Sequence, residues 1–192
     1  CASIDEYENH VIKKHENTRR EKEEDRVRHV DICDAQTGPI FLAYRNQESL
    51  KKIVADVKTG AALFDFTSED GIRHRGWKIA DTEKISAIYE AFHQMNALYI
   101  ADGHHRAASA VRVGVKRREE HPGYTGEEEF NYFLSVIFPD DELMIMDYNR
   151  VVRELNGLTP EEFLSGIKKV FDVEKLDKAE HPKRKGQVTL FL

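Results

Sequence analysis

Five consecutive residues combine groups that can bind an anion and move a proton: Asp102, Gly103, His104, His105 and Arg106, here called the DGHHR box. The box follows a short apolar run that predicts a buried strand, and it precedes an Ala-rich segment that predicts a helix. The first turn of a helix exposes unpaired N–H groups and the positive end of the helix dipole. An anion, above all a phosphate, is therefore the ligand that this position favours.

Each side chain of the box has a role in such a site. Arg106 can bind a phosphate through two hydrogen bonds, and a histidine can donate or accept a proton near neutral pH. Asp102 can accept the proton of a substrate hydroxyl or hold a magnesium ion. The alternative interpretation is a polar helix start, in which Asp102 caps the helix and His104 and His105 are structural.

A second group of candidate residues lies in a highly charged segment, where eleven of the fourteen residues from Lys13 to Arg26 carry a charge. In one interpretation, His15 or Glu16 completes the site and Arg19 or Arg26 binds an anionic substrate. In the other, the segment is a solvated helix face with salt bridges, which is the usual role of a charge run. The full set of second-tier candidates is His15, Glu16, Thr18, Arg19, Asp25 and Arg26.

Composition and missing motifs exclude several classes of protein. A formal net charge of −6 argues against nonspecific binding of nucleic acid. No run approaches the roughly 20 apolar residues that a membrane helix needs, so we expect no membrane partner. The two cysteines form no CxxC pair, so we expect a reducing cytoplasm, no disulfide framework and no zinc. The Walker A, GxGxxG and GxSxG motifs are absent from the sequence.

Sequence patterns also predict the elements that position these residues. Capping boxes that begin at Ser3 and Thr18 predict two helices, over residues 4–14 and 19–31. Asp70-Gly71 lies between two strand-like runs and predicts a hairpin. Apolar periodicity and turn signals predict strands at 40–44, 61–67, 72–79, 98–101, 130–138, 143–151 and 188–192, and helices at 48–58, 82–92, 104–119 and 160–170.

These elements define the expected fold class. Strands and helices alternate, but two hairpins interrupt the order, so we predict an α/β fold with an α+β tendency, built on a mixed sheet with flanking helices. We expect three parts: a charged helical segment at 1–36, an α/β core with the box at 37–155, and a C-terminal helix–strand segment at 156–192.

The box resembles the phosphate-binding box of the ParB/sulfiredoxin-like superfamily, which is Gly-x-His/Arg-Arg at a strand-to-helix turn. ParB proteins place Glu after the glycine and sulfiredoxins place a catalytic Cys there, whereas this chain has His104. The nearest resemblance is to free-serine kinases, whose box is similar to Asp-Gly-His-x-Arg. It implies a strand–Gly–helix unit with a nucleotide phosphate near Gly103 to Arg106, and it places Asp102 and a histidine at the phosphoryl-transfer centre.

More of the chain resembles a large bacterial domain-of-unknown-function family, number 1015. The shared features are His-Glu-x-Thr at 15–18, Asp-Arg at 25–26 and Ile-Ala-Asp-Gly-His-His-Arg at 100–106, and the likeness covers most of the 192 residues. That family has a segment before the position of Cys1, so the resemblance implies that this sequence is a fragment of a longer protein.

Three functional hypotheses follow. The first is a phosphotransferase that uses ATP or ADP with Mg²⁺ and acts on a small hydroxylated metabolite such as free serine. The alternative is a non-catalytic, nucleotide-binding regulatory module with the same pocket. The third is a metal-assisted hydrolase that uses His15, His104 and His105. The expected partners are a nucleotide and a small-molecule substrate.

Overall fold

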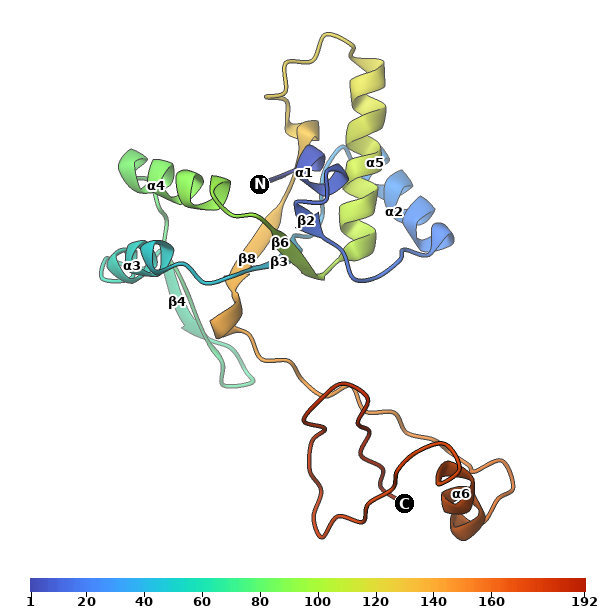
Figure 1. Cartoon of the computed structure of the whole chain (residues 1–192). Coiled ribbons are helices and arrows are strands. Elements are labelled where there is room, and N and C mark those ends of the chain that lie inside the picture. The colour runs from blue at the N-terminus through green and yellow to red at the C-terminus, as the bar shows by residue number, and fades with distance from the viewer. The chain divides into compact units, whose positions relative to one another are not determined.

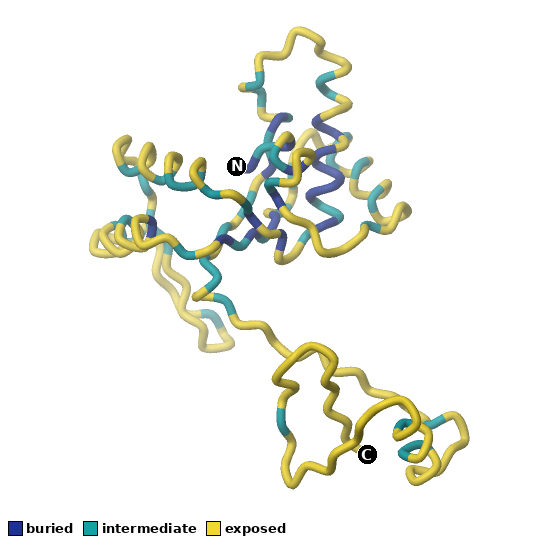
Figure 2. Tube along the Cα trace, viewed as in Figure 1, coloured by how far each residue is buried: buried dark blue, intermediate teal, exposed yellow.

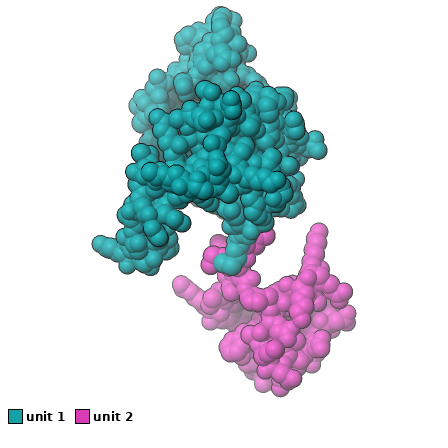
Figure 3. Space-filling model, turned by 90° about the vertical axis from the view of Figure 1, so that its left-hand side faces the viewer, with its two compact units in different colours: residues 1–144 teal, residues 145–192 magenta.

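A computed structural model describes residues 1–192 of the chain (Figure 1). The chain forms two compact units, residues 1–144 and residues 145–192 (Figure 3), and each is described by itself. The division into 1–36, 37–155 and 156–192 stays a prediction. None of the helices combines the length and the apolar content that a membrane-spanning segment requires.

The first unit is built on a four-stranded sheet that contains both parallel and antiparallel pairs. β2 pairs parallel to β6, β6 pairs antiparallel to β3, and β3 pairs parallel to β8. The predicted mixed sheet is therefore confirmed, in the order β2 (Ile12–Lys13), β6 (Leu98–Asp102), β3 (Ile40–Tyr44) and β8 (Ser135–Pro139).

Helix α5 (His104–Glu120) buries one face in the core of the first unit. Its small residues Ala107, Ala108 and Ala110 are buried together with Ile40 and Leu42 of β3 (Figure 2). Small side chains let the helix approach its neighbours closely, so the Ala-rich sequence after the box serves packing. The remaining buried apolar residues of this core are Ala2, Ile4, Tyr7, Ile12, Tyr44, Leu50, Leu98, Ile100, Val111 and Phe133.

The N-terminal region differs from the prediction. The helix expected over 4–14 ends early, because α1 covers only Ile4–Glu8 and His10 adopts a φ of +60°. This left-handed turn redirects the chain so that Ile12 enters the sheet in β2, where it is fully buried. Burial of Ile12 beside β6 therefore overrides the local helix pattern.

The second predicted helix forms, but its start differs from the prediction. α2 covers Arg20–Cys33, and its N-cap residue is Arg19, which makes no side-chain capping bond. The capping box expected from Thr18 is wrong, since the Thr18 hydroxyl donates to the Glu23 carboxylate instead. The hydroxyl therefore ties the loop to the side of the helix and leaves the helix N-terminus uncapped.

Residues between β3 and β6 form two helices and the predicted hairpin. The order is α3 (Glu48–Val57), β4 (Phe64–Thr67), β5 (Arg73–Gly76) and α4 (Thr82–His93). Gly71 in the hairpin turn has a φ of +82°, as a turn after Asp70 requires. The Asp81 side chain caps α4 by accepting from the Lys84 N–H.

The chain after α5 is more broken than predicted. The strand expected over 130–138 is split into the short helix η1 (Glu129–Asn131), β7 (Tyr132–Phe133) and β8, because β7 leaves the main sheet to pair with β1 (Ala2–Ser3). β8 is the last strand of the chain, and the short helix η2 (Asp140–Glu142) follows it directly.

Two predicted strands near the C-terminus are wrong. Residues 143–151 and 188–192 form no strand. The side chains of Ile145, Val151 and Phe191 are more than nine-tenths exposed, and most of the trace after residue 144 is coloured as exposed in Figure 2. A strand needs a partner for its backbone groups, and nothing pairs with these segments. The predicted helix at 160–170 forms as α6 (Pro160–Ile167), and its complete capping box uses the Thr159 and Glu162 side chains.

A close approach at Gly114 gives the first prediction. An added Cβ would overlap the Phe130 carbonyl oxygen and would lie 2.8 Å from the Ile4 Cδ1. We expect Gly114→Ala to lower the free energy of unfolding by about 1–3 kcal/mol, as overpacking typically does. Denaturant titration checks this. Gly123→Ala is the control, because no atom lies within 4 Å of its Cβ position, and equal stability of the two variants would contradict the prediction.

Candidate functional site

The DGHHR box lies where β6 ends and α5 begins, as the sequence predicts. Gly103 joins the two elements with a φ of +95°, and the Ala107 N–H donates to its carbonyl oxygen at 2.9 Å. A Cβ at this position would lie 3.0 Å from the Arg106 Nη2. The left-handed backbone conformation therefore favours glycine here, and a side chain would also displace the Arg106 guanidinium.

Asp102 and Arg106 bind each other across the first turn of α5. The Arg106 Nη2 donates to the Asp102 Oδ2 at 2.9 Å, with the carboxylate largely exposed. The Arg106 Nε is buried and has no hydrogen-bond partner. The guanidinium thus neutralises the predicted base or magnesium ligand through its Nη2, while its Nε, on the same edge, keeps no hydrogen-bond partner.

His104 is the buried member of the box. Its Nε2 accepts a long hydrogen bond, 3.5 Å, from the His15 N–H, and its Nδ1 lies 3.8 Å from the Glu16 Oε2. The His15 ring stands edge-on to the His104 ring, with 4.4 Å between the centroids. Burial and the neighbouring His15 lower the pKa of His104 from its usual 6.5, against the opposing effect of Glu16 and Asp102. His104 is therefore neutral at pH 7.

His105 is held by the same loop. Its Nε2 accepts from the Arg19 N–H at 3.1 Å, and its carbonyl oxygen accepts from the Ser109 hydroxyl at 2.6 Å. An imidazole that accepts at Nε2 carries its proton on Nδ1, so these contacts assign the Nδ1–H tautomer to both histidines of the box.

The structure brings together two candidate groups that are far apart in the sequence. His15, Glu16 and Arg19 lie against the box, at separations of 86–89 residues. The other second-tier residues do not contact it in this way. Thr18 donates to Glu23, and Asp25 pairs with the exposed Arg28. Arg26 makes no hydrogen bond or ion pair to the box, although it and Arg106 both line a small cavity.

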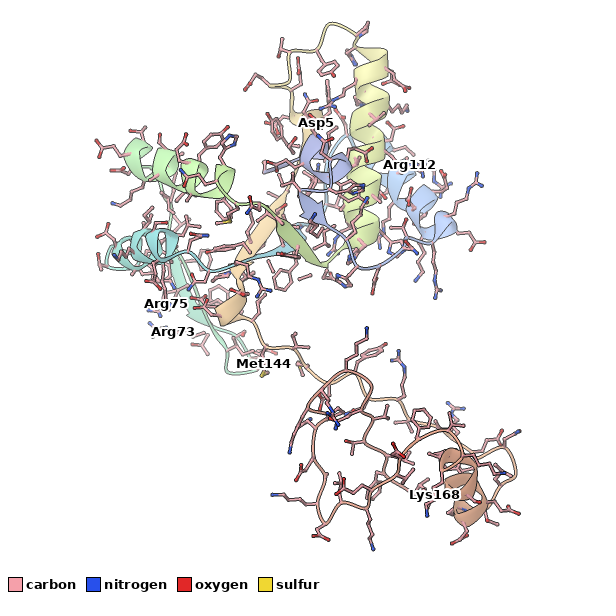
Figure 4. All side chains as sticks on the ribbon, in the orientation of Figure 1. Asp5, Arg73, Arg75, Arg112, Met144 and Lys168 are labelled. Carbon is pink, nitrogen blue, oxygen red and sulfur yellow. The ribbon has the colours of Figure 1, made fainter.

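Ion pairs hold α2 against α5, although no residue of α2 is buried. Arg112 contacts Glu23 and Glu24 at 2.9 Å each, and Lys116 contacts Asp31 at 2.6 Å. Figure 4 labels Arg112 on α5, next to α2. Arg112 is not among the candidate residues predicted from the sequence. The sequence feature that could have indicated these ion pairs is the regular spacing of opposite charges along both helices. That spacing identifies the pairs only once the two helices are known to be neighbours.

The histidines do not form a metal-binding cluster. No group of three or more His, Cys, Asp or Glu side chains in residues 1–192 is arranged to hold a metal ion. His15 and His104 are neighbours, but both point toward backbone and ring contacts within the protein. The geometry therefore offers no support to the metal-assisted hydrolase.

The fold and the box define a mixed α/β protein with a strand–Gly–helix site that a charged loop covers. The chain belongs to the family described as "Protein of unknown function (DUF1015)", which matches residues 1–192. A search of curated proteins and a search of solved structures gave no match. The resemblance to that family is confirmed, and the resemblance to the ParB/sulfiredoxin-like superfamily stays a prediction.

The environment of His104 predicts how stability depends on pH. Because its folded-state pKa is lowered, the unfolded chain binds the proton more tightly, and stability falls as the pH drops below about 6.5. We expect an NMR titration of the imidazole to give a pKa below 6.5. We also expect His104→Gln to reduce the loss of stability between about pH 7 and pH 5. The exposed His93→Gln is the control, and a pKa of His104 above 6.5 would contradict the prediction.

The ion pairs between α2 and α5 predict a dependence on salt. Exposed pairs contribute about 0.2–1 kcal/mol each, and they are screened when the Debye length falls from about 10 Å at 0.1 M to about 3 Å at 1 M salt. We expect amide hydrogen exchange in α2 to become roughly fivefold faster in 1 M NaCl, as the loss of about 1 kcal/mol implies. The amides of β3 serve as the internal control. Exchange in α2 that does not change with salt would show that other contacts hold the helix.

Proposed function

We propose that the chain binds the phosphate groups of a nucleotide at the junction of β6 and α5, and transfers a phosphoryl group to a small hydroxylated metabolite such as free serine. The observation that carries this proposal is the meeting of the two candidate groups. The loop from His15 to Arg19 contacts both histidines of the DGHHR box. Candidate bases and anion donors that lie within contact of one another are the geometric criterion for an uncharacterised active site.

The first turn of α5 supplies the anion-binding part. The first helical bond is donated by Ala107, so the N–H groups of His104, His105 and Arg106 remain available at the positive end of a 17-residue helix. Arg106 adds a charged donor that can bind a phosphate oxygen. ATP or ADP with Mg²⁺ is the proposed nucleotide, and the exposed Asp102 carboxylate is the group that can hold the metal ion.

The transfer step assigns roles to the remaining residues. The substrate hydroxyl gives its proton to a base, its oxygen bonds to the terminal phosphorus, and the bond between that phosphorus and the leaving group breaks. The leaving group is ADP when ATP is the donor and AMP when ADP is the donor. Asp102 is the exposed carboxylate of the box, and where it does not hold the metal ion it is the proposed base. His104 is neutral and buried, so its proposed role is to hold the loop from His15 to Arg19 in position. His105 belongs to the first turn of α5, so its proposed place is beside the phosphate.

One observation favours the alternative of a non-catalytic, nucleotide-binding module. Asp102 is bound by Arg106, and both histidines of the box already accept a hydrogen bond from the loop. In this arrangement every candidate base of the box already has a hydrogen-bond partner, which a module that only binds a nucleotide would allow.

Ligand-dependent stability tests the shared core of both functions. We expect ATP, ADP, CTP or GTP, with or without Mg²⁺, to raise the stability by about 2.7 kcal/mol at 100 times the dissociation constant. Arg106→Ala should weaken this effect and leave the fold intact. Arg45→Ala is the matched control, because Arg45 follows the end of β3 that lies away from the box. No shift with any nucleotide would exclude both functions.

Transfer of labelled phosphate to a panel of hydroxylated amino acids and sugars separates the two. A labelled product that Asp102→Asn abolishes supports the phosphotransferase, whereas binding without transfer supports the regulatory module.

A further inference from the structure

A groove of about 340 Å³ lies between the end of α3, the start of α4 and the segment that joins β5 to α4 (Figure 1). Small-molecule sites typically occupy about 300–1,000 Å³, so the groove has room for a ligand the size of an amino acid. α3 follows β3 and α4 precedes β6, whereas the DGHHR box follows the other end of β6. The groove is therefore separate from the candidate site.

Trp77 forms an aromatic wall of this groove. Its indole N–H donates to the Gly60 carbonyl oxygen at 3.1 Å, and the Arg75 guanidinium lies 5.3 Å from the ring centroid. These two contacts hold the half-buried ring in one orientation. Val57 and Ile79 add aliphatic surface to the lining. This part of the groove favours an apolar group, because binding here removes apolar surface from water.

Charged side chains of both signs line the same groove. The Lys84 Nζ contacts the Asp56 Oδ2 at 2.9 Å and leaves the Oδ1 free. Asp81 caps α4, since its Oδ1 accepts from the Lys84 N–H. Lys78 is exposed and takes part in no ion pair of the chain. The groove therefore offers a free carboxylate oxygen at Asp56 and a free ammonium group at Lys78.

This mixture of charges discriminates between classes of ligand. An anion would meet the carboxylates of Asp56 and Asp81, and a simple cation would meet the ammonium groups of Lys78 and Lys84. A zwitterion avoids both conflicts, because its ammonium can contact a carboxylate while its carboxylate contacts a lysine. Each end of such a ligand then forms a charge-assisted hydrogen bond.

We propose that this groove binds a free α-amino acid with an apolar side chain. The ammonium of the ligand contacts Asp56, its carboxylate contacts Lys78, and its side chain packs on the Trp77 ring. The site does not depend on the proposed function, because none of the residues that line it belongs to the box or to the loop from His15 to Arg19. Free serine has a side chain too small to cover the indole ring, so we expect it to bind here more weakly than leucine.

Fluorescence of Trp77, the only tryptophan of the chain, reports on binding without any assay of activity. We expect L-leucine, added to the full chain in the millimolar range, to change the tryptophan emission in a saturable way. Isocaproate lacks the ammonium group of leucine, and isoamylamine lacks its carboxylate. Neither compound should cause a saturable change over the same range.

Substitutions of the two charged contact residues test their assignment. Lys78→Gln and Asp56→Asn should each weaken leucine binding about tenfold, as expected for the loss of a charge-assisted hydrogen bond. Both side chains are exposed, so we expect both variants to fold. Lys52→Gln is the matched control, because Lys52 is an exposed lysine of α3 that does not line the groove.

The outcomes separate this site from the proposed function. A saturable change with leucine that needs Lys78 and Asp56 but not Lys52 supports the amino-acid site, even if no nucleotide shifts the stability of the chain. Absence of a saturable change with leucine overturns the proposal. Binding of isocaproate or isoamylamine that equals the binding of leucine, or equal affinity of the Lys78→Gln and Lys52→Gln variants for leucine, overturns it as well.

Discussion

Burial of α5 constrains the elements around it. Ala107 and Ser109 are fully buried and Ala110 nearly so, so that the helix packs directly against its neighbours without long side chains between them. At Gly114 the approach leaves no space for a methyl group beside the Phe130 carbonyl. A close-packed interior leaves little room for the helix to shift. The packing of α5 therefore fixes where the helix starts, and with it the direction of the box side chains.

The outer side of α5 is held by charge rather than by apolar contact. Arg112, Lys116 and Arg117 bind carboxylates of α2, which has no buried residue. Such contacts are weak one by one and sensitive to salt. The elements that cover the box are therefore attached less firmly than the core beneath it, a combination common where ligands must enter.

A neutral buried histidine links these two regions. His104 lies between the core and the loop that precedes α2, and it accepts its hydrogen bond from the His15 backbone. Protonation would remove that acceptor and place a charge in a desolvated position. The attachment of the His15–Arg19 loop to the box therefore depends on the protonation state of the His104 imidazole.

Local patterns predicted the elements whose stability is local. The Asp70-Gly71 turn, the capping box of α6 and the strand–Gly–helix junction at Gly103 form as predicted, because each depends on φ preferences and hydrogen bonds within a few residues. The apolar segment at 143–151 has the composition of a strand but forms none, because strand pairing needs a partner that composition does not provide.

The sequence by itself determined the box, its position between a strand and a helix, and the mixed α/β class of the fold. Only the tertiary structure decided that the loop from His15 to Arg19 covers the box, that Arg112 holds α2, and that Arg26 and Arg106 share a cavity. The physical reason is distance along the chain. Contacts between residues more than 80 positions apart arise from the packing of α2 on α5, and no local preference encodes them.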